Sequence, residues 1–382
     1  MRIAILQSGD LEKLALGGID QYIKNIIRNR EDNEITVFGT CVHGQYEIGK
    51  EYRISKEGLE YSFVAISDDS KKPLTKGYLM NEPRFLKWIN EYDVIYVQRI
   101  ELTLPFIFCK SSRNKLIQVV HGSSYYHTLH MNKIKSSIYL LLEHISICIA
   151  KKTYVVLMRD EFGVPYYQRK YPKKANRIKY TKIPVDTSIF ARVDKNTARE
   201  RLGLPTDKFI IMYGGRVENY PKRVFLFPDI LEKLKTYSND FHFIIVGSGN
   251  DIDELAGKFA EKGLMNNVTI AGYVEDRKRF VDYINASDVN INISEFEGTC
   301  TSSLESVACG TPIVSTDAGD IKLFARNSLN GYIIANSNNA SIINDSVNSI
   351  LKIKSGQCRL TDDYMRYECK NVVHELFIDF QR

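Results

Sequence analysis

The chain has 382 residues, of which 44% are hydrophobic and 26% charged. This composition excludes a wholly disordered chain, and the length suffices for two hydrophobic cores. No apolar run reaches the roughly 18–20 residues that span a bilayer, and the first residues lack the apolar core of a signal peptide. We therefore expect a cytoplasmic protein. The seven cysteines form no Cys-x-x-Cys pair, which favours reduced thiols over a disulfide framework or a zinc module.

The net charge of +6 is unevenly distributed along the chain. Residues 103–182 hold 15 basic and 3 acidic residues. Such a segment favours an anionic partner, although a solvated basic face is the alternative. Tyrosines mixed with lysines at 166–182 suit a membrane interface, and no nucleic-acid-binding module accompanies them. We expect peripheral association with the inner face of an anionic cell membrane, through residues of about 110–182, and no nucleic-acid partner.

The first half of the chain alternates between strand and helix patterns. Residues 2–7 form a short apolar run, and apolar residues at 19, 22, 23, 26 and 27 have helical spacing. Further short buried strands are predicted at 35–38, 94–97 and 116–120. Strands separated by helical stretches predict a parallel sheet with helices on both faces.

The pattern restarts after Ile183-Pro184-Val185-Asp186, a predicted linker. Five strand-to-loop transitions follow, with predicted strands at 209–213, 243–246, 268–270, 289–293 and 312–314. We expect two Rossmann-like, doubly wound α/β domains at 1–185 and 186–360. Residues 361–382 are predicted to form a helix that returns to the first domain. Sheets of this kind bind ligands at the carboxyl ends of their strands, which places the active site in a cleft between the domains.

The most informative segment is residues 294–314. Two carboxylates, Glu297 and Glu305, are separated by seven residues, and Gly298 and several hydroxyl residues lead into a predicted helix. A loop that ends in a helix N-terminus offers backbone N–H groups to an anion. Glu297 can accept hydrogen bonds from sugar hydroxyls, and Glu305 can accept two from a ribose diol. A structural alternative for Glu305 is a capping box with Ser302.

This segment resembles the E-x7-E signature of the retaining glycosyltransferases of family four, in which a glutamate, a glycine-rich loop and a second glutamate precede small-x-Gly-x-Pro-Val. The matching residues are Glu297, Gly298, Glu305, Ala308, Gly310, Pro312 and Val314. The resemblance implies the GT-B fold, with two Rossmann-like domains that face each other across a cleft. It also implies that the C-terminal domain binds a nucleotide-sugar and the N-terminal domain the acceptor.

A second motif places Arg216 just past a predicted strand and Lys222 six residues further on. A guanidinium can bind phosphate oxygens in a bidentate manner, and an ammonium adds a point charge. Alone, such a pair would more often be surface charge. In the family that the chain resembles, the matching Arg and Lys neutralise the diphosphate without a metal, so the resemblance implies no metal and no cofactor.

Weaker matches complete the candidate site. His121 directly follows a predicted strand, where the family often has a histidine near the reacting sugar, although a lone histidine is more often structural. We take Arg216, Lys222, Glu297 and His121 as catalytic candidates. The donor-binding candidates are Gly17, Gly18, Gly215, Gly247, Gly249, Val274, Gly298, Thr299, Cys300, Thr301 and Glu305.

The sequence departs from the family pattern at two places beside the donor. Thr299-Cys300 stands where Phe-Gly is common, and Lys222-Arg223 stands where Lys-Gly is common. We expect a retaining glycosyltransferase that uses a UDP-sugar, or alternatively a GDP-sugar. Its acceptor would be a saccharide or a lipid-linked saccharide, in cell-surface polysaccharide or glycolipid assembly. The alternatives are a sugar-nucleotide epimerase or phosphorylase on the same fold, and a non-catalytic partner protein.

Overall fold

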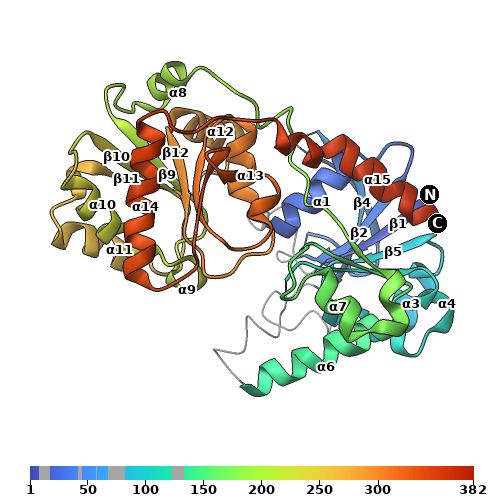
Figure 1. Cartoon of the computed structure of the whole chain (residues 1–382). Coiled ribbons are helices and arrows are strands. Elements are labelled where there is room, and N and C mark those ends of the chain that lie inside the picture. The colour runs from blue at the N-terminus through green and yellow to red at the C-terminus, as the bar shows by residue number, and fades with distance from the viewer. Residues whose placement is uncertain (8–17, 42–44, 57, 68–81, 123–132) are drawn as a thin grey trace. The chain divides into compact units, whose positions relative to one another are not determined.

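The computed structural model describes residues 1–7, 18–41, 45–56, 58–67, 82–122 and 133–382. The chain forms two compact units (Figure 1). The first comprises Met1–Pro184 together with Cys369–Arg382, and the second comprises Val185–Glu368. Residues 361–368, which we expected in the returning helix, are therefore part of the second unit, and the helix α15 (Cys369–Gln381) begins only at Cys369.

The first unit is built on an eight-stranded sheet in the order β3-β4-β2-β1-β5-β6-β7-β8. Its strands are β1 (Arg2–Leu6), β2 (Glu34–Thr40), β3 (Glu51–Lys56), β4 (Leu59–Ser67), β5 (Val94–Val97), β6 (Leu116–Val120), β7 (Lys152–Val155) and β8 (Ile178–Tyr180). All neighbours are parallel except β3 and β4, which pair antiparallel. The strands predicted at 2–7, 35–38, 94–97 and 116–120 are confirmed as β1, β2, β5 and β6.

Helices cover both faces of this sheet, because its central strands carry apolar side chains toward both sides. In β1, Ile3 and Ile5 contribute to one core, whereas Ala4 and Leu6 contribute to the other. The helices are α1 (Gly18–Arg28), α3 (Glu82–Ile89), η1 (Ile100–Ile107), α4 (Lys110–Arg113), α6 (Lys133–Ile149), α7 (Val164–Lys170), η2 (Pro172–Arg177) and α15. α1, α7 and α15 fill the first core, and α3 and η1 fill the second.

The second unit contains a seven-stranded sheet in the order β11-β10-β9-β12-β13-β15-β14. Its strands are β9 (Phe209–Gly214), β10 (Phe241–Val246), β11 (Val268–Gly272), β12 (Val289–Asn292), β13 (Ile313–Thr316), β14 (Arg326–Asn327) and β15 (Asn330–Ile334). The chain builds outward from β9 in one direction, then returns to place β12 on its other side. This reversal between β9 and β12 is the topological switch point, where sheets of this type bind ligands.

Helices again cover both faces of the second sheet. They are α8 (Lys195–Leu202), α9 (Asn219–Lys222), η3 (Val224–Leu226), α10 (Phe227–Lys235), α11 (Ile252–Glu261), η4 (Met265–Asn267), α12 (Arg277–Ala286), α13 (Thr301–Ala308), η5 (Ile321–Leu323), α14 (Asn339–Lys354) and η6 (Asp363–Tyr367). α10, α11 and α14 pack on one side, and α12 and α13 on the other. None of the helices in the described parts of the chain has both the length and the apolar character to cross a membrane.

Candidate active site

Two loops meet at the switch point of the second unit. Lys222 ends α9 in the loop that follows β9, and Glu297 lies in the loop that follows β12. The Nζ atom of Lys222 donates a hydrogen bond to Oε1 of Glu297. The two side chains are only 17% and 14% exposed, respectively. The structure thus brings together two residues from separate motifs that lie 75 positions apart.

Further polar groups hold the Glu297 carboxylate in place. The Ser294 hydroxyl donates to Oε1 at 2.7 Å, and Nδ2 of Asn292 lies 3.5 Å from the same oxygen. Burial alone would raise the pKa of Glu297, but the charge of Lys222 and these hydrogen bonds outweigh it and lower the pKa below its ordinary value. Glu297 is therefore a fixed anion at neutral pH.

Arg216 lies on the same loop as Lys222 but has a different partner. Its Nη1 atom is 2.9 Å from Oε2 of Glu218, and its side chain is 64% exposed. The Tyr213 hydroxyl, buried at the end of β9, donates a hydrogen bond of 2.7 Å to the carbonyl of Arg216. The backbone at Arg216 is therefore fixed, whereas its guanidinium lies at the surface.

Glycines allow the loops after β9 and β10 to pack backbone against backbone. Gly247 has φ +152°, and a Cβ atom there would lie 1.8 Å from the carbonyl oxygen of Gly215. A Cβ atom at Gly249 would lie 2.1 Å from the carbonyl oxygen of Val217. Only glycine fits such an approach. These residues shape the loop that carries Arg216.

The second carboxylate of the motif, Glu305, lies on α13 and is paired with Arg277. Nη2 of Arg277 lies 3.1 Å from Oε1 of Glu305. Burial raises the pKa of Glu305, and the Arg277 charge offsets this only in part. The capping box with Ser302 does not form, because α13 begins at Thr301 and Ser302 lies inside its first turn.

The remaining donor-binding candidates of the second unit lie around the N-terminus of α13 and after β11. Gly298 is approached by Gly319, where a Cβ atom would lie 2.0 Å from the Gly298 carbonyl oxygen. Thr301 Oγ1 donates to the Thr299 carbonyl at 3.2 Å. Cys300 is buried in the core, and its thiol donates to the Ala318 carbonyl at 3.4 Å, which is a packing position. Val274 is partly buried against the same core.

His121 belongs to the first unit, where it directly follows β6. Its Nε2 atom is 2.8 Å from Oε1 of Gln98, and its ring contacts that of Tyr22 edge-on at 5.5 Å. Burial, followed by the charge of Arg99, lowers the pKa of His121 to about 3. The imidazole is therefore neutral at physiological pH. Gly18 begins α1 in the same unit, and Gly17 lies outside the described residues.

The structure also reveals residues to which the sequence alone assigned no role. Asn292, Ser294 and Arg277 support the two glutamates, and no sequence signal distinguished them from other polar residues. Arg223 had a signal, since it stands where the family pattern has glycine. It adopts φ +53°, and its Nη1 atom donates to Oδ1 of Asn336 at 2.6 Å and to the Ile293 carbonyl at 3.3 Å. Arg223 thereby ties the loop of Lys222 to the end of β12.

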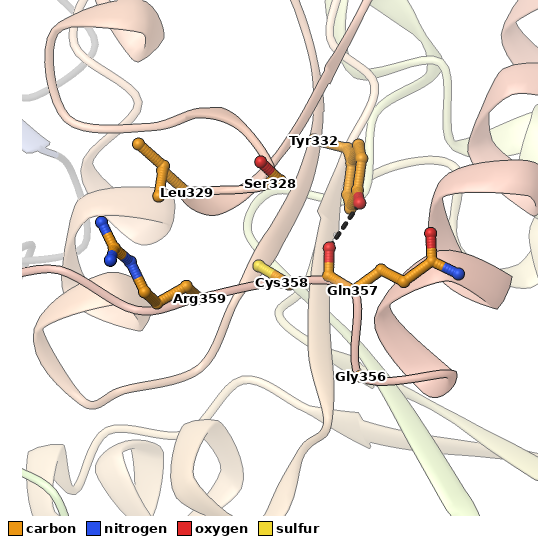
Figure 2. Close-up of a pocket in the computed structure, with 7 residues that line it drawn as sticks. All are labelled: Ser328, Leu329, Tyr332, Gly356, Gln357, Cys358 and Arg359. Carbon is orange, nitrogen blue, oxygen red and sulfur yellow. Dashed lines mark hydrogen bonds between the residues drawn. The ribbon is translucent and has the colours of Figure 1, made fainter.

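Within the described residues, no group of three or more His, Cys, Asp or Glu side chains could hold a metal ion. A wide, shallow pocket of about 530 Å³ lies where the turn after α14 runs beside β15 (Figure 2). It is lined by Ser328, Leu329, Tyr332, Gly356, Gln357, Cys358 and Arg359. The Tyr332 hydroxyl donates to the Gln357 carbonyl at 2.5 Å and closes one side. None of the predicted site residues lines this pocket.

Comparison with solved structures defines the fold class. Over its whole length, the chain is similar to sucrose-phosphate synthase from Thermosynechococcus elongatus, with a TM-score of 0.80, 15% identity and 98% of that chain covered. It is also similar over its whole length to Anabaena HepE solved in complex with UDP and glucose, with a TM-score of 0.72, 15% identity and 99% of that chain covered. The expected fold class, two Rossmann-like α/β domains of GT-B type, is confirmed.

Comparison of sequences locates the family likeness in the second unit. Residues 194–367 match the model of the family described as glycosyl transferases group 1. The chain is 30% identical over 172 residues to D-inositol 3-phosphate glycosyltransferase from Acidothermus cellulolyticus. This match covers 43% of the chain and 38% of the relative, so the chain aligns with little more than a third of that protein's length. The matched residues contain Arg216, Lys222, Glu297 and Glu305.

Proposed function

We propose that this protein is a retaining glycosyltransferase that transfers a sugar from a nucleotide-sugar to an acceptor hydroxyl. The observation that carries the proposal is the Lys222–Glu297 pair at the switch point between β9 and β12. It lies within the residues that match the glycosyl transferase family, at the edge where doubly wound sheets bind ligands. The resemblance of residues 294–314 to the E-x7-E motif of family four, which includes Glu297 and Glu305, supports the proposal.

In this proposal the second unit binds the donor. Lys222 and Arg216 stabilise the negative charge that develops on the diphosphate as the bond to the sugar breaks. Glu297, held as an anion by its neighbours, accepts hydrogen bonds from the sugar hydroxyls. Glu305 accepts hydrogen bonds from the ribose diol. The two cationic side chains supply the charge for which other enzymes use a metal, so the proposed reaction is metal-independent and needs no cofactor.

The transfer proceeds on the face of the sugar from which the leaving group departs. The bond between the anomeric carbon and the phosphate oxygen breaks, and a bond to the acceptor oxygen forms on the same face. The acceptor hydroxyl gives its proton to the departing phosphate, and the anomeric configuration is kept. His121 stays neutral at physiological pH and is proposed to form a hydrogen bond with the donor sugar.

The donor that we propose is a UDP-sugar, with a GDP-sugar as the alternative. One structural neighbour was solved with UDP and glucose, which supports the first. We propose a saccharide or a lipid-linked saccharide as acceptor, in cell-surface polysaccharide or glycolipid assembly at the inner face of the cell membrane. The basic segment 103–182 of the first unit supports an anionic surface as partner.

The donor site is tested by thermal melting with UDP, GDP, ADP and TDP, each with magnesium or with EDTA. A ligand that binds only the folded protein stabilises it by about 2.7 kcal/mol at a hundredfold excess over its Kd. We expect one nucleotide to raise the melting midpoint equally in magnesium and in EDTA. Absence of any shift at millimolar nucleotide would favour a non-catalytic partner protein. Incubation with the donor alone and with acceptors separates transfer from epimerisation, which needs no acceptor.

The role of Lys222 is tested by Lys222→Ala. The matched control is Lys258→Ala on α11, whose partly exposed side chain pairs with Glu254 outside the candidate site. Loss of a charge-assisted contact to phosphate should weaken nucleotide binding by about tenfold or more and reduce transfer further. Titration of the melting midpoint measures the affinity. Nucleotide affinity and transfer near the wild-type level in Lys222→Ala would exclude this assignment.

A further inference from the structure

Helix α6 has an inverted pattern of burial. Its buried side chains include the polar Ser136, Glu143 and Ser146. Large apolar side chains on the same helix face solvent instead: Ile134 is 76% exposed, Ile138 54% and Leu141 59%. A surface helix normally buries its apolar side chains and exposes its polar ones. Packing in the core of the first unit therefore does not explain why these apolar side chains are exposed.

The exposed apolar residues form one continuous row. Ile134, Ile138 and Leu141 are spaced by four and three positions, so they lie above one another on the same face of the helix. Leu140 is also exposed beside them. Scattered exposed apolar residues are ordinary, but a row along a helix is typical of an interaction surface. We call this row the outer face of α6.

Contacts on the opposite side fix the rotation of α6 about its axis. The Tyr167 hydroxyl on α7 donates a hydrogen bond of 2.9 Å to Oε2 of Glu143, and Lys170 Nζ lies 3.5 Å from Oε1. Rotation of the outer face into the core would break these contacts and leave the Glu143 carboxylate buried without partners. The apolar row is therefore held outward by the fold.

Basic residues lie at both ends of α6. Lys133 and Lys135 flank Ile134 in the first turn of α6. η2 lies against the other end of the helix, because Lys174 Nζ donates to the carbonyl of Cys148. Two further cations of η2, Lys173 and Arg177, are exposed. Lys133, Lys173 and Arg177 form no salt bridge to any residue that the structure describes. Figure 1 shows the first turns of α6 extending beyond the neighbouring elements of the first unit.

The acidic residues nearby do not cancel this charge. Of the three between 103 and 182, Glu143 is buried against Lys170, and Asp160 is 3.0 Å from Arg169. Glu161 is the third acidic residue of the segment. Of the 15 basic residues, Arg169 and Lys170 belong to these pairs, and Lys152, Lys179 and Lys182 pair with Asp379 or Glu375 of α15, so cations still outnumber acids. A second copy of the chain would bring the same cations to the outer face and be repelled. The charge selects an anionic occupant.

We propose that the outer face of α6 docks on an anionic lipid bilayer, with Ile134, Ile138 and Leu141 inserted among the headgroups. A bilayer offers an apolar layer and phosphates at neighbouring depths, which matches an apolar row flanked by cations. The sequence predicts membrane contact through the basic residues and their tyrosines, whereas the structure adds an apolar surface. The membrane as the place of a lipid-linked acceptor rests on the proposed function, whereas the docking surface itself rests on the burial and charge of α6.

The test is flotation of the full chain with vesicles of phosphatidylcholine, alone or with about one-third phosphatidylserine. The outer-face variant combines Ile134→Ser, Ile138→Ser and Leu141→Ser. The control combines Met265→Ser and Ile378→Ser, which replace exposed apolar residues elsewhere. We expect the wild type and the control to bind anionic vesicles, and the outer-face variant to bind at least about tenfold more weakly. Equal melting midpoints show that all three proteins are folded.

A second variant, Lys173→Ala with Arg177→Ala, tests the charge. Its binding should fall severalfold, and it should depend less on salt than wild-type binding does. Equal vesicle binding by the wild type and the outer-face variant would overturn the proposal, as would equal binding of the wild type to neutral and anionic vesicles. A dimer that the outer-face variant abolishes, without vesicle binding, would overturn it in favour of a second copy. Vesicle binding without any nucleotide-induced melting shift would support the docking surface and refute the proposed function.

Discussion

Glu297 and Glu305 are separated by seven residues, yet their surroundings shift their pKa values in opposite directions. Both are buried, which penalises the charged form. Lys222, Ser294 and Asn292 overcome this penalty at Glu297 and lower its pKa. The charge of Arg277 does not overcome this penalty at Glu305, whose pKa is raised. The two carboxylates of one motif are thus physically different groups.

This difference predicts opposite pH dependences for two matched variants. Ionised Glu297 stabilises the fold above its unfolded pKa, and this contribution is lost as pH falls through its lowered folded pKa. Glu297→Gln should therefore cost about 2 kcal/mol at pH 7, and its difference from the wild type should shrink below pH 4.5. Glu305 stabilises the fold below its unfolded pKa, and this contribution is lost as pH rises through its raised folded pKa.

The stability of Glu305→Gln relative to the wild type should accordingly be highest at neutral pH and lowest near pH 4. Melting midpoints of the three proteins between pH 3.5 and 8 measure both slopes. Parallel curves for the two variants would contradict the assignment of opposite shifts.

Arg223 occupies a left-handed backbone conformation that glycine adopts more easily, so its side chain must compensate for the strain. Its hydrogen bonds to Asn336 and to the Ile293 carbonyl connect the loop of Lys222 to the segment between β12 and Glu297 and to the segment after β15. Arg223→Gly should leave stability within about 1 kcal/mol of the wild type, because relief of strain offsets the lost bonds. We expect nucleotide affinity to fall about threefold to tenfold, since the loop of Lys222 loses its tether.

Calorimetric titration with the nucleotide identified by melting gives the affinity of Arg223→Gly. Lysine at this position keeps the charge but lacks the planar fork, so Arg223→Lys should show a similar loss of nucleotide affinity. An unchanged nucleotide affinity in both variants would show that the hydrogen bonds of Arg223 do not position the loop of Lys222 for binding.

At the scale of elements, the loops after β9 and β10 depend on glycine in a way that a helix does not. Gly247→Ala would place a methyl group 1.8 Å from the Gly215 carbonyl oxygen, in a backbone conformation that alanine disfavours. It should destabilise the protein by about 2 kcal/mol or more and displace the loop of Arg216. The control is Gly257→Ala in α11, where the added Cβ meets nothing within 4 Å.

Gly257→Ala should instead stabilise the protein by about 0.5–1 kcal/mol, because alanine is the better helix former. Urea unfolding of both variants measures the two changes. Equal effects at the two positions would show that backbone contact between the loops does not matter.

At the scale of the whole molecule, the chain leaves the first unit at Pro184 and returns to it at Cys369. The core of that unit therefore includes the last helix of the chain. Phe380 on α15 is buried, and its ring lies 5.0 Å from that of Tyr96 in the central region of the sheet. Phe380→Ala should cost about 3–5 kcal/mol, whereas Ile378→Ala on the exposed side of α15 should cost less than about 1 kcal/mol.

Fluorescence of Trp88, the one tryptophan of the sequence, reports on the first unit, since it lies on α3. Phe380→Ala should lower the unfolding midpoint seen by this fluorescence much more than Ile378→Ala does. A small loss for Phe380→Ala would show that α15 is not an integral part of the first unit's core.

Patterns local in the sequence predicted the doubly wound α/β architecture and singled out two residues of the candidate site that the structure brings together. Short apolar runs followed by glycine or serine predicted β9 to β13, and period-3.6 spacing predicted α1. Such predictions work because the residues that form a buried strand or helix face are close along the chain. Strands β3, β4, β7, β8, β14 and β15 were missed. In the antiparallel pair β3–β4, β3 is not a continuous apolar run and β4 begins with alternating polar residues. The two motifs likewise singled out Lys222 and Glu297 through residue type and spacing alone.

Only the tertiary structure decided which of these residues meet. The order of strands puts β12 beside β9, and this long-range choice joins Lys222 to Glu297 while Arg216 pairs with Glu218. The opposite pKa shifts of Glu297 and Glu305 depend on partners from other elements, and the outward face of α6 depends on contacts with α7. Periodicity gives the faces of an element, but the partner of each face comes from packing between segments far apart in the chain.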